Sequence, residues 1–258
     1  MVDSESNGIE SVQGFTRGLA VIRCFGEDAA RLTLTDVAKR TGLSRAGARR
    51  LLYTLCNENY ADTDGKFFWL TPRILDLGYS YLSSMELWGF AQEYLEKLRE
   101  SLGESASIAV LDGNDVVYVL RAQTKRMLAS YLGVGSRIPA YVVSLGRIQL
   151  AMLPDAKLEQ YLSQATLEKF TPFTIDNVDD LRERLKIDRE RGYSIVMKEL
   201  ELGISGVAMP VRDRLHRTIA AISCNFRPDI GEEPAKMKEI ISNLQQTRDE
   251  IETVLRMR

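Results

Sequence analysis

The chain has 258 residues, of which 45% are hydrophobic and 27% charged, and its formal net charge is −2. This composition is that of an ordinary globular protein with room for two domains. The chain has no run of about eighteen apolar residues, which excludes a transmembrane helix. The polar residues 1–10 do not resemble a signal peptide and are expected to be a disordered tail. Cys24, Cys56 and Cys224 lack metal-ligand spacing, which indicates reduced thiols in a cytoplasmic protein.

The segment 11–73 has the pattern of a small helical domain. Its first helix is expected at Thr16–Phe25, with Leu19 and Ile22 facing the core. Ten basic and six acidic residues within 11–75 give this part a net charge of +4, so the rest of the chain carries −6. A basic small domain on an acidic body indicates that the first part binds a polyanion.

Residues 32–55, LTLTDVAKRTGLSRAGARRLLYTL, predict two helices joined by a tight turn. Thr33 and Asp36 have the capping-box spacing that begins a helix, Gly42 ends it, and Ser44 caps the next helix. The second helix has an apolar stripe with a period of 3.6 residues and a basic opposite face. This is the pattern of a helix-turn-helix whose second helix enters the major groove of DNA.

A β-hairpin is expected directly after these helices. In Tyr60–Leu70 the apolar residues alternate around Asp64-Gly65, which is a strong hairpin signal. A helix-turn-helix followed by a short hairpin is a winged helix, and Lys66 at the hairpin tip is available to a phosphate.

The basic face of the second helix allows two interpretations. Arg45, Arg49 and Arg50 either read bases and phosphates or are solvated charges, because any amphipathic helical hairpin can carry a basic face. Ser44 is expected mainly as a helix cap, with a phosphate contact as a second role.

The segment 74–86 is expected to be a linker helix that follows Thr71-Pro72, with proline at the first helical position. This segment is more apolar than a free linker should be, and its simplest use is packing against another copy of the chain. A second long helix is expected at Leu87–Leu102, closed by Gly103.

The remaining residues predict a sensor-like domain of strands and helices. Strands are expected at 107–112, 116–123, 128–132, 193–198, 205–211 and 218–226. Pro139 is expected to open a helical segment, and further helices are expected at 155–164, 178–191 and 234–257. This order describes an α+β fold with a curved, mainly antiparallel sheet flanked by helices.

Six blocks of the sequence, in order from Val12 to about Phe226, resemble the IclR family of bacterial transcriptional regulators. The blocks are RGLAVIRCF, LTLTDVAKRTGLSRAGARRLLYTL, TDGKFFWLTPRILDLG, GSRIPAYVVSLGRIQLAML, RERGYSIVMKELELGISGVAMPVRD and IAAISCNF. The stretch TPRILDLGYSYLSSMELWGFAQEYLEKL, with AGARRLLYTL, is similar to the branch that controls the breakdown of aromatic acids, the PcaR- and PobR-like regulators. The chain past Phe226 departs from the family pattern.

The resemblance implies a winged helix-turn-helix domain over 11–73, a dimerising linker helix over 74–86, and an effector-binding and oligomerisation domain over 87–258. It implies a cytoplasmic regulator of a catabolic operon that binds double-stranded operator DNA as a homodimer or a dimer of dimers, with RNA polymerase as a further partner. The residues expected to contact DNA are Thr33, Ser44, Arg45, Ala46, Arg49, Arg50 and Lys66.

The resemblance also implies a pocket for a small organic acid, between the sheet and the Pro139-led segment. The residues carried over to it by position are Ser144, Leu145, Val196, Gly206, Ser223 and Asn225, with Leu128 and Leu132 in an apolar wall. Val196 stands where the family can have an acid and Gly206 where it can have a cysteine, so the ligand should differ from that of the smallest-acid sensors. We expect an aromatic acid or a ring-cleavage product. Arg121 is the candidate partner of its carboxylate, with a surface salt bridge as the alternative.

Catalysis has no support in the sequence. It holds no nucleophile–base constellation, metal-ligand cluster or cofactor motif, so we expect no catalytic residue, no metal and no cofactor. His216 is expected to be an ordinary surface residue and Arg137 an anchor for its loop. Two other functions stay open: an enzyme of small acids fused to a DNA-binding module, or a regulator whose C-terminal domain serves only as a dimerisation scaffold.

Overall fold

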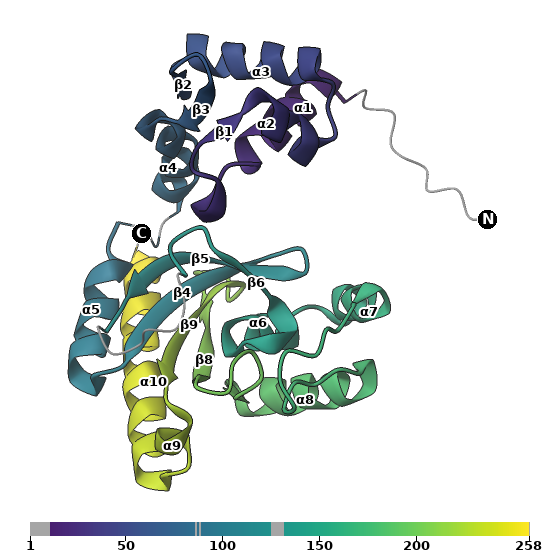
Figure 1. Cartoon of the computed structure of the whole chain (residues 1–258). Coiled ribbons are helices and arrows are strands. Elements are labelled where there is room, and N and C mark those ends of the chain that lie inside the picture. Colours follow the sequence, from purple (N-terminus) through teal and green to yellow (C-terminus); the bar gives the residue numbers. More distant parts are fainter. Residues whose placement is uncertain (1–10, 86, 88, 125–131, 258) are drawn as a thin grey trace. The chain divides into compact units, whose positions relative to one another are not determined.

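The computed structural model describes residues 11–85, 87, 89–124 and 132–257. The chain divides into two compact units, Met1–Tyr81 and Leu82–Arg258. Within the described part of the chain, no helix is long and apolar enough to cross a membrane. Figure 1 shows the helices and strands of each unit.

The N-terminal unit is a winged helix-turn-helix. Its helices are α1 (Gln13–Arg23), α2 (Leu34–Thr41) and α3 (Arg45–Asn57), with a short 3-10 turn η1 (Glu27–Ala29). Strands β1 (Leu32–Thr33), β3 (Phe67–Leu70) and β2 (Ala61–Thr63) pair antiparallel in that order. Their common core holds Val21, Leu32, Val37, Ala48, Leu52 and Phe68.

Local signals account for most boundaries in this unit. The Thr33 side chain accepts a hydrogen bond from the Asp36 N–H, and the Asp36 side chain accepts one from the Thr33 N–H, so the predicted capping box is confirmed. Gly42 ends α2 in the left-handed region at φ 68°, which glycine adopts at no steric cost. Ser44 caps α3 as expected.

The first helix differs from its prediction. It begins at Gln13 and ends at Arg23, and the residue that it buries completely is Val21, while Leu19 and Ile22 are half-buried. The extra strand β1 was not expected, because two residues carry too little periodicity to be recognised.

The C-terminal unit contains one six-stranded antiparallel sheet, in the order β6-β5-β4-β9-β8-β7. The strands are β4 (Ser105–Asp112), β5 (Asp115–Ala122), β6 (Arg137–Pro139), β7 (Ser194–Met197), β8 (Ser205–Arg212) and β9 (Thr218–Phe226). The predicted α+β fold is confirmed.

Helices cover both faces of this sheet, as Figure 1 shows. Helices α5 (Ala91–Leu102) and α10 (Pro234–Met257) pack on one face over an apolar cluster that includes Ile108 and Ile222. On the other face, α6 (Ser144–Ala151), α7 (Asp155–Gln164) and α8 (Val178–Arg191) pack over a second cluster. The sheet is therefore the middle of three layers.

The segments that connect the long helices and strands differ more from the sequence-based expectation than these helices and strands do. Pro139 is the last residue of β6 and precedes the 3-10 turn η3 (Ala140–Val142), so the expected helical segment begins with this turn and is interrupted at Val143 before α6. Most of the strand expected at 128–132 lies outside the described residues, and Leu132, which is described, belongs to no strand. The short helix α9 (Pro228–Gly231) was not expected.

The linker region begins with a 3-10 turn, η2 (Pro72–Ile74), and continues as α4 (Leu75–Ser84). The division between the two compact units falls inside α4, after Tyr81. The predicted domain boundaries at 73 and 86 stay predictions.

Candidate functional site

The solvent face of α3 is basic. Arg45, Arg49 and Arg50 are exposed on it, together with Ala46, while Ala48 and Leu52 are buried on the opposite side. The Arg49 guanidinium carbon lies 5.5 Å from the centroid of the Tyr53 ring, which gives that side chain a flat surface to rest on. The α3 face can therefore present three cations to a polyanion.

Thr33 and Ser44, two of the polar residues expected to contact DNA, cap the N-termini of α2 and α3. The Ser44 hydroxyl accepts a hydrogen bond from the Gly47 N–H at 3.1 Å. The Thr33 hydroxyl donates to an Asp36 carboxylate oxygen at 2.6 Å. Both hydroxyls thus have a structural role, and a phosphate contact would be additional.

The wing is the hairpin between β2 and β3, and Lys66 is exposed in its turn. Asp64 shapes this turn, since one of its carboxylate oxygens accepts from the Lys66 and Phe67 N–H groups at 3.0 and 2.7 Å. These backbone bonds lower the pKa of Asp64.

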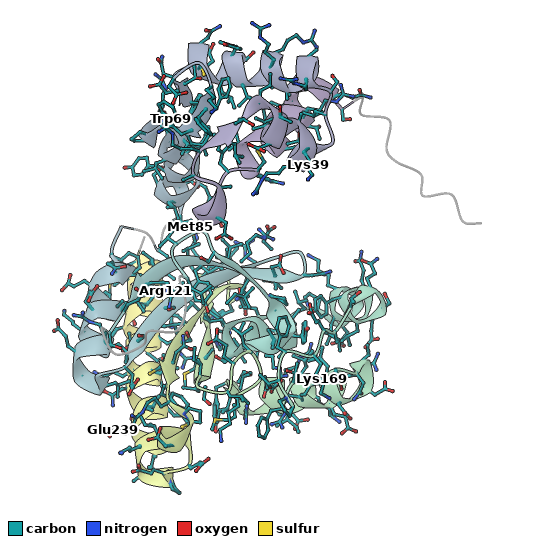
Figure 2. The ribbon with its side chains drawn as sticks, in the orientation of Figure 1. Lys39, Trp69, Met85, Arg121, Lys169 and Glu239 are labelled. Carbon is teal, nitrogen blue, oxygen red and sulfur yellow. The ribbon has the colours of Figure 1, made fainter. Side chains whose placement is uncertain are left out.

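Arg31 is a neighbour of the wing that sequence reasoning missed. Its guanidinium forms an ion pair with Asp64 at 2.7 Å and lies 4.3 Å from the Trp69 ring centroid. Figure 2 labels Trp69 on the N-terminal unit. Arg31, the residue directly before β1, is therefore joined to the wing turn that carries Lys66.

The helix α4 exposes large apolar side chains. Leu75 is 70% exposed, Leu77 51%, Tyr79 63% and Tyr81 52%. Soluble monomers rarely expose so much apolar surface on one short segment.

The C-terminal unit holds a pocket whose floor is a row of four side-chain positions across the sheet. The strand register places Ser105 of β4 opposite Asn225 of β9, Asn225 opposite Gly206 of β8, and Gly206 opposite Val196 of β7. All four residues line the pocket. Gly206 opens the middle of the floor because it has no side chain.

The first turn of α6 forms a wall over this floor. Ser144 and Leu145 both line the pocket, and the first hydrogen bonds of the helix run from the Gly146 and Arg147 N–H groups to the Val143 carbonyl. The N–H groups of residues 144 and 145 have no hydrogen-bond acceptor among the described residues, as at other helix N-termini, and such N–H groups attract anions.

Ser144 and Asn225 converge above Gly206. A Cβ built on Gly206 would lie 3.0 Å from the Ser144 hydroxyl oxygen and 2.6 Å from Asn225 Oδ1. Two side chains with hydrogen-bonding groups therefore meet at the one position of the floor where the backbone is bare.

Arg121 of β5 lines the pocket and is labelled in Figure 2. Its guanidinium lies 4.8 Å from the Tyr118 ring centroid, and its Nη1 donates to the Leu132 carbonyl. Its Nε is buried, with no hydrogen-bond partner among the described residues. Burial lowers the pKa of Arg121 and raises that of Tyr118. Arg121 forms no ion pair within the described residues, so it keeps a donor for a ligand.

The structure brings most of the predicted pocket residues together. Those that line one pocket are Arg121, Leu132, Ser144, Leu145, Val196, Gly206 and Asn225. Ser223 is completely buried one row deeper, opposite Ser107, and does not line the pocket. Leu128 lies outside the described residues.

Sequence reasoning missed the loop between β7 and β8. Glu199, Leu200 and Ile204 of this loop line the pocket. The charged residue Arg147 within the apolar segment LGRIQLAML was the signal available, because a charge in such a helix needs a buried partner.

Two further polar residues, Arg137 and His216, were expected to have no functional role. Arg137 forms ion pairs with Asp112 and Asp115 at 2.7 and 3.2 Å, which anchor its strand to the neighbouring hairpin. His216 is exposed in the β8–β9 turn at φ 57°. Within the described residues, no group of three or more His, Cys, Asp or Glu side chains could hold a metal.

A winged helix with a basic α3, joined to a sheet domain that contains a small pocket with polar groups, is the architecture of a DNA-binding regulator with a candidate ligand site. Family models agree: "IclR helix-turn-helix domain" matches residues 15–65 and "Bacterial transcriptional regulator IclR C-terminal" matches 79–253. The chain belongs to the IclR family and is a DNA-binding transcriptional regulator.

Relatives of known role extend along nearly the whole chain. The chain is 39% identical to the Pca regulon regulatory protein of Pseudomonas putida over 208 residues, which is 80% of this chain and 72% of that protein. It is 35% identical to the p-hydroxybenzoate hydroxylase transcriptional activator of Acinetobacter baylyi over 249 residues, covering 95% and 92%. These relatives confirm the predicted aromatic-catabolism branch.

A solved structure supports the fold. The crystal structure of a transcriptional regulator from Rhodococcus sp. RHA1 superposes with a TM-score of 0.84 at 41% identity, covering 95% of this chain and 98% of that one. The chain therefore shares its fold with this solved regulator.

Proposed function

We propose that this regulator responds to a small organic acid, an aromatic acid or a product of aromatic ring cleavage, bound in the pocket under α6. The observation that carries the proposal is the meeting of Ser144 and Asn225 above Gly206, beside the free N–H groups of the α6 N-terminus. A carboxylate needs several donors when it leaves water. Hydroxyl, amide and backbone donors at this point meet that need.

Arg121 supplies the positive charge in this proposal. Its Nε, which has no partner among the described residues, and its place in the pocket lining suit a carboxylate at the far end of a ligand or a second acidic group. Leu132, Leu145 and Val196 give the apolar surface that a ring requires. A mostly apolar pocket with a few placed polar groups is the usual form of a small-molecule site.

The relatives support the aromatic class. Two of them are named for the Pca regulon and for p-hydroxybenzoate hydroxylase, and they are 39% and 35% identical to this chain. We infer that the operon controlled here belongs to the same kind of metabolism.

The DNA side of the proposal places α3 in the major groove. Arg45, Arg49 and Arg50 would read bases and phosphates there, and Lys66 of the wing would reach a phosphate. The caps Thr33 and Ser44 and the exposed Ala46 complete the interface.

The assembly proposed is a homodimer formed through α4, which can pair further into a dimer of dimers. Two copies would bury the exposed apolar side chains of α4 and present two recognition helices to a palindromic operator. Because its ligand is operator DNA, the regulator would work in the cytoplasm, next to RNA polymerase. Effector binding would shift the dimer between two arrangements with different operator affinity.

One titration tests the effector proposal. Purified protein is titrated with 4-hydroxybenzoate, other aromatic acids and dicarboxylic acids, with heat of binding and operator affinity as the two readouts. Binding of an acid that changes operator affinity supports a sensor. Turnover of an acid would instead indicate an enzyme, and the absence of any binding would indicate a dimerisation scaffold.

A further inference from the structure

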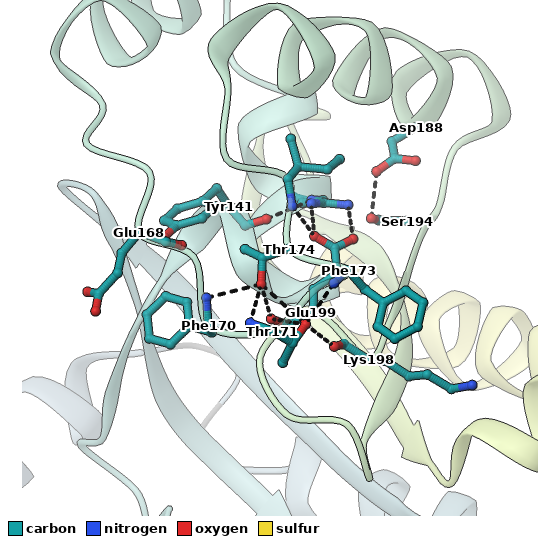
Figure 3. Close-up of polar contacts among 12 residues, drawn as sticks. Tyr141, Glu168, Phe170, Thr171, Phe173, Thr174, Asp188, Ser194, Lys198 and Glu199 are labelled. Carbon is teal, nitrogen blue, oxygen red and sulfur yellow. Dashed lines mark hydrogen bonds and ion pairs between the residues drawn. The ribbon is translucent and has the colours of Figure 1, made fainter.

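A buried ion pair joins Arg147 of α6 to Glu199, a pocket-lining residue of the β7–β8 loop. Arg147 is 0% exposed and Glu199 7%. The guanidinium donates from Nη1 and Nη2 to the two carboxylate oxygens at 2.8 and 2.5 Å, in the parallel two-bond arrangement. Figure 3 shows these contacts and the residues around them.

The same guanidinium also holds the segment before α6. Its Nε donates to the Tyr141 carbonyl at 2.6 Å. Tyr141 directly precedes Val142 and Val143, which line the pocket. One side chain therefore ties the pocket-lining segment 142–145 to the β7–β8 loop, which also lines the pocket.

Glu199 is fixed from a third side by the segment before α8. The Thr171 and Thr174 hydroxyls donate at 2.6 Å to the Lys198 and Glu199 carbonyls respectively. The Ile175 N–H donates at 3.2 Å to the Glu199 carboxylate. These bonds fix the backbone where Lys198 takes a left-handed conformation at φ 62° and the chain turns back toward β8.

Stability alone is a poor reason for this pair. Removing two charges from water is costly, and well-packed apolar residues often stabilise a core as well as a buried pair does. Burial lowers the pKa of Arg147, yet a guanidinium remains charged in proteins. What the pair supplies is a fixed geometry, because each group can satisfy the other in one arrangement only.

We propose that Arg147 and Glu199 are positioning residues of the effector pocket: their ion pair holds the 199–204 loop at the distance from α6 that the acid requires. The inference deepens the proposed function and rests on it. It predicts that breaking the pair weakens effector binding and leaves operator binding to the N-terminal unit intact.

The first test compares Glu199→Gln with Glu252→Gln. Glu252 of α10 is a matched control, because it is also 7% exposed, accepts bonds from Arg212 N–H and Arg256, and packs on the other face of the sheet. E199Q replaces one carboxylate oxygen with an amide NH2 group. That group is itself a donor, so it cannot accept the hydrogen bonds that Arg147 and the Ile175 N–H now donate to the carboxylate. We expect E199Q to bind 4-hydroxybenzoate, or the panel acid that binds wild type most tightly, at least tenfold more weakly, with operator affinity unchanged. E252Q should bind the acid within twofold of wild type.

If E199Q does not fold, a second pair of less disruptive variants tests the same inference. Thr174→Val keeps the side-chain shape and removes the hydroxyl that holds the Glu199 carbonyl. Thr247→Val is its control, since Thr247 is 8% exposed on α10 and its hydroxyl bonds only the helix carbonyl of Asn243 among the described residues. We expect a severalfold loss of acid affinity in T174V and none in T247V.

Hydrogen exchange of the protein without effector gives a readout that does not depend on the ligand. The Lys198 and Ile204 N–H groups bond within the loop, to the Ile204 and Glu201 carbonyls. Their exchange should be faster in E199Q and T174V than in wild type and unchanged in the two controls. Equal loss of acid affinity in variants and controls, or unchanged affinity and exchange in E199Q and T174V, would overturn the inference. If no acid binds wild type, the proposed function fails, while the exchange rates still decide whether the pair positions the loop.

Discussion

The backbone of Gly146 lies directly against that of Ala140. A Cβ built on Gly146 would be 2.1 Å from the Ala140 carbonyl oxygen and 2.4 Å from its Cα. This approach brings the turn η3 against α6; the pocket-lining Val142 ends η3, and the pocket-lining Val143 joins it to α6. The shape of the pocket wall therefore depends on a glycine that no ligand needs to touch.

We expect Gly146→Ala to destabilise the C-terminal unit and to impair effector binding. The added methyl cannot fit unless two backbone segments separate, and such overpacking costs about 1–3 kcal/mol or more. Thermal unfolding of the full chain measures the effect. Gly14→Ala in α1 is the control, since its Cβ would meet nothing within 4 Å and should cause no loss. A G146A protein as stable as wild type would show that η3 moves freely against α6.

Arg49→Ala tests the recognition helix. If Arg49 reads a base, the change should cost about 1–3 kcal/mol of operator binding and relax the preference for the operator over scrambled DNA. Gel-shift titrations at fixed salt measure both quantities. Lys157→Ala, on the surface of α7, is the matched removal of an exposed cation and should leave binding unchanged. A folded triple variant of Arg45, Arg49 and Arg50 that binds the operator as wild type does would refute the assignment.

Leu77→Glu tests the proposed dimer. Leu77 is 51% exposed on α4, and a charge there would have to be buried in an interface between two copies. Sedimentation should show a dimer for wild type at micromolar concentration and a larger monomer fraction for the variant. Ile187→Glu places the same charge on a 48% exposed apolar residue of α8 and should not alter the assembly. A wild-type monomer at this concentration would contradict the proposal.

The capping box predicts a pH dependence for the N-terminal unit. The Thr33 hydroxyl and N–H hold the pKa of Asp36 below its ordinary value. Because the folded pKa lies below the unfolded one, the Asp36 carboxylate stabilises the fold above the unfolded pKa, and this contribution is lost as the pH falls through the folded value. Asp36→Asn should therefore lower the melting temperature at pH 7 and have a smaller effect near pH 3. Equal effects at both pH values would rule out the carboxylate as the source.

Local patterns predicted the winged helix well, and long-range contacts explain what they missed. Helix caps such as Thr33 and Ser44 depend on residues three positions away, so the sequence shows them directly. The Arg31–Asp64 and Arg147–Glu199 pairs join residues 33 and 52 positions apart, and no period or spacing connects them.

The lining of the pocket also depends on long-range contacts that no sequence pattern shows. Asn225 and Ser223 both face the α6 side of β9, and the family resemblance carried both into the site. The strand register places Asn225 in the floor row and Ser223 one row deeper, opposite Ser107. Which of two alternate residues a ligand can reach depends on how far α6 covers the sheet, and that is a property of packing.

Ser144→Phe gives the decisive test of the pocket. The Ser144 hydroxyl oxygen lies 3.0 Å from where a Gly206 Cβ would be, so a ring at position 144 would fill the space that the acid needs. We expect the variant to bind its operator as wild type does and to lose the effector response.

Two further variants separate blocking from misfolding. Ser144→Ala removes one donor without adding bulk and should weaken acid binding by about 1 kcal/mol, roughly fivefold. Ser163→Phe, on the exposed surface of α7, should respond normally. A normal response from Ser144→Phe, or binding of neutral hydrophobic compounds alone, would show that the pocket or the ligand class is a different one, because a carboxylate that lost both its space and its donor cannot remain bound.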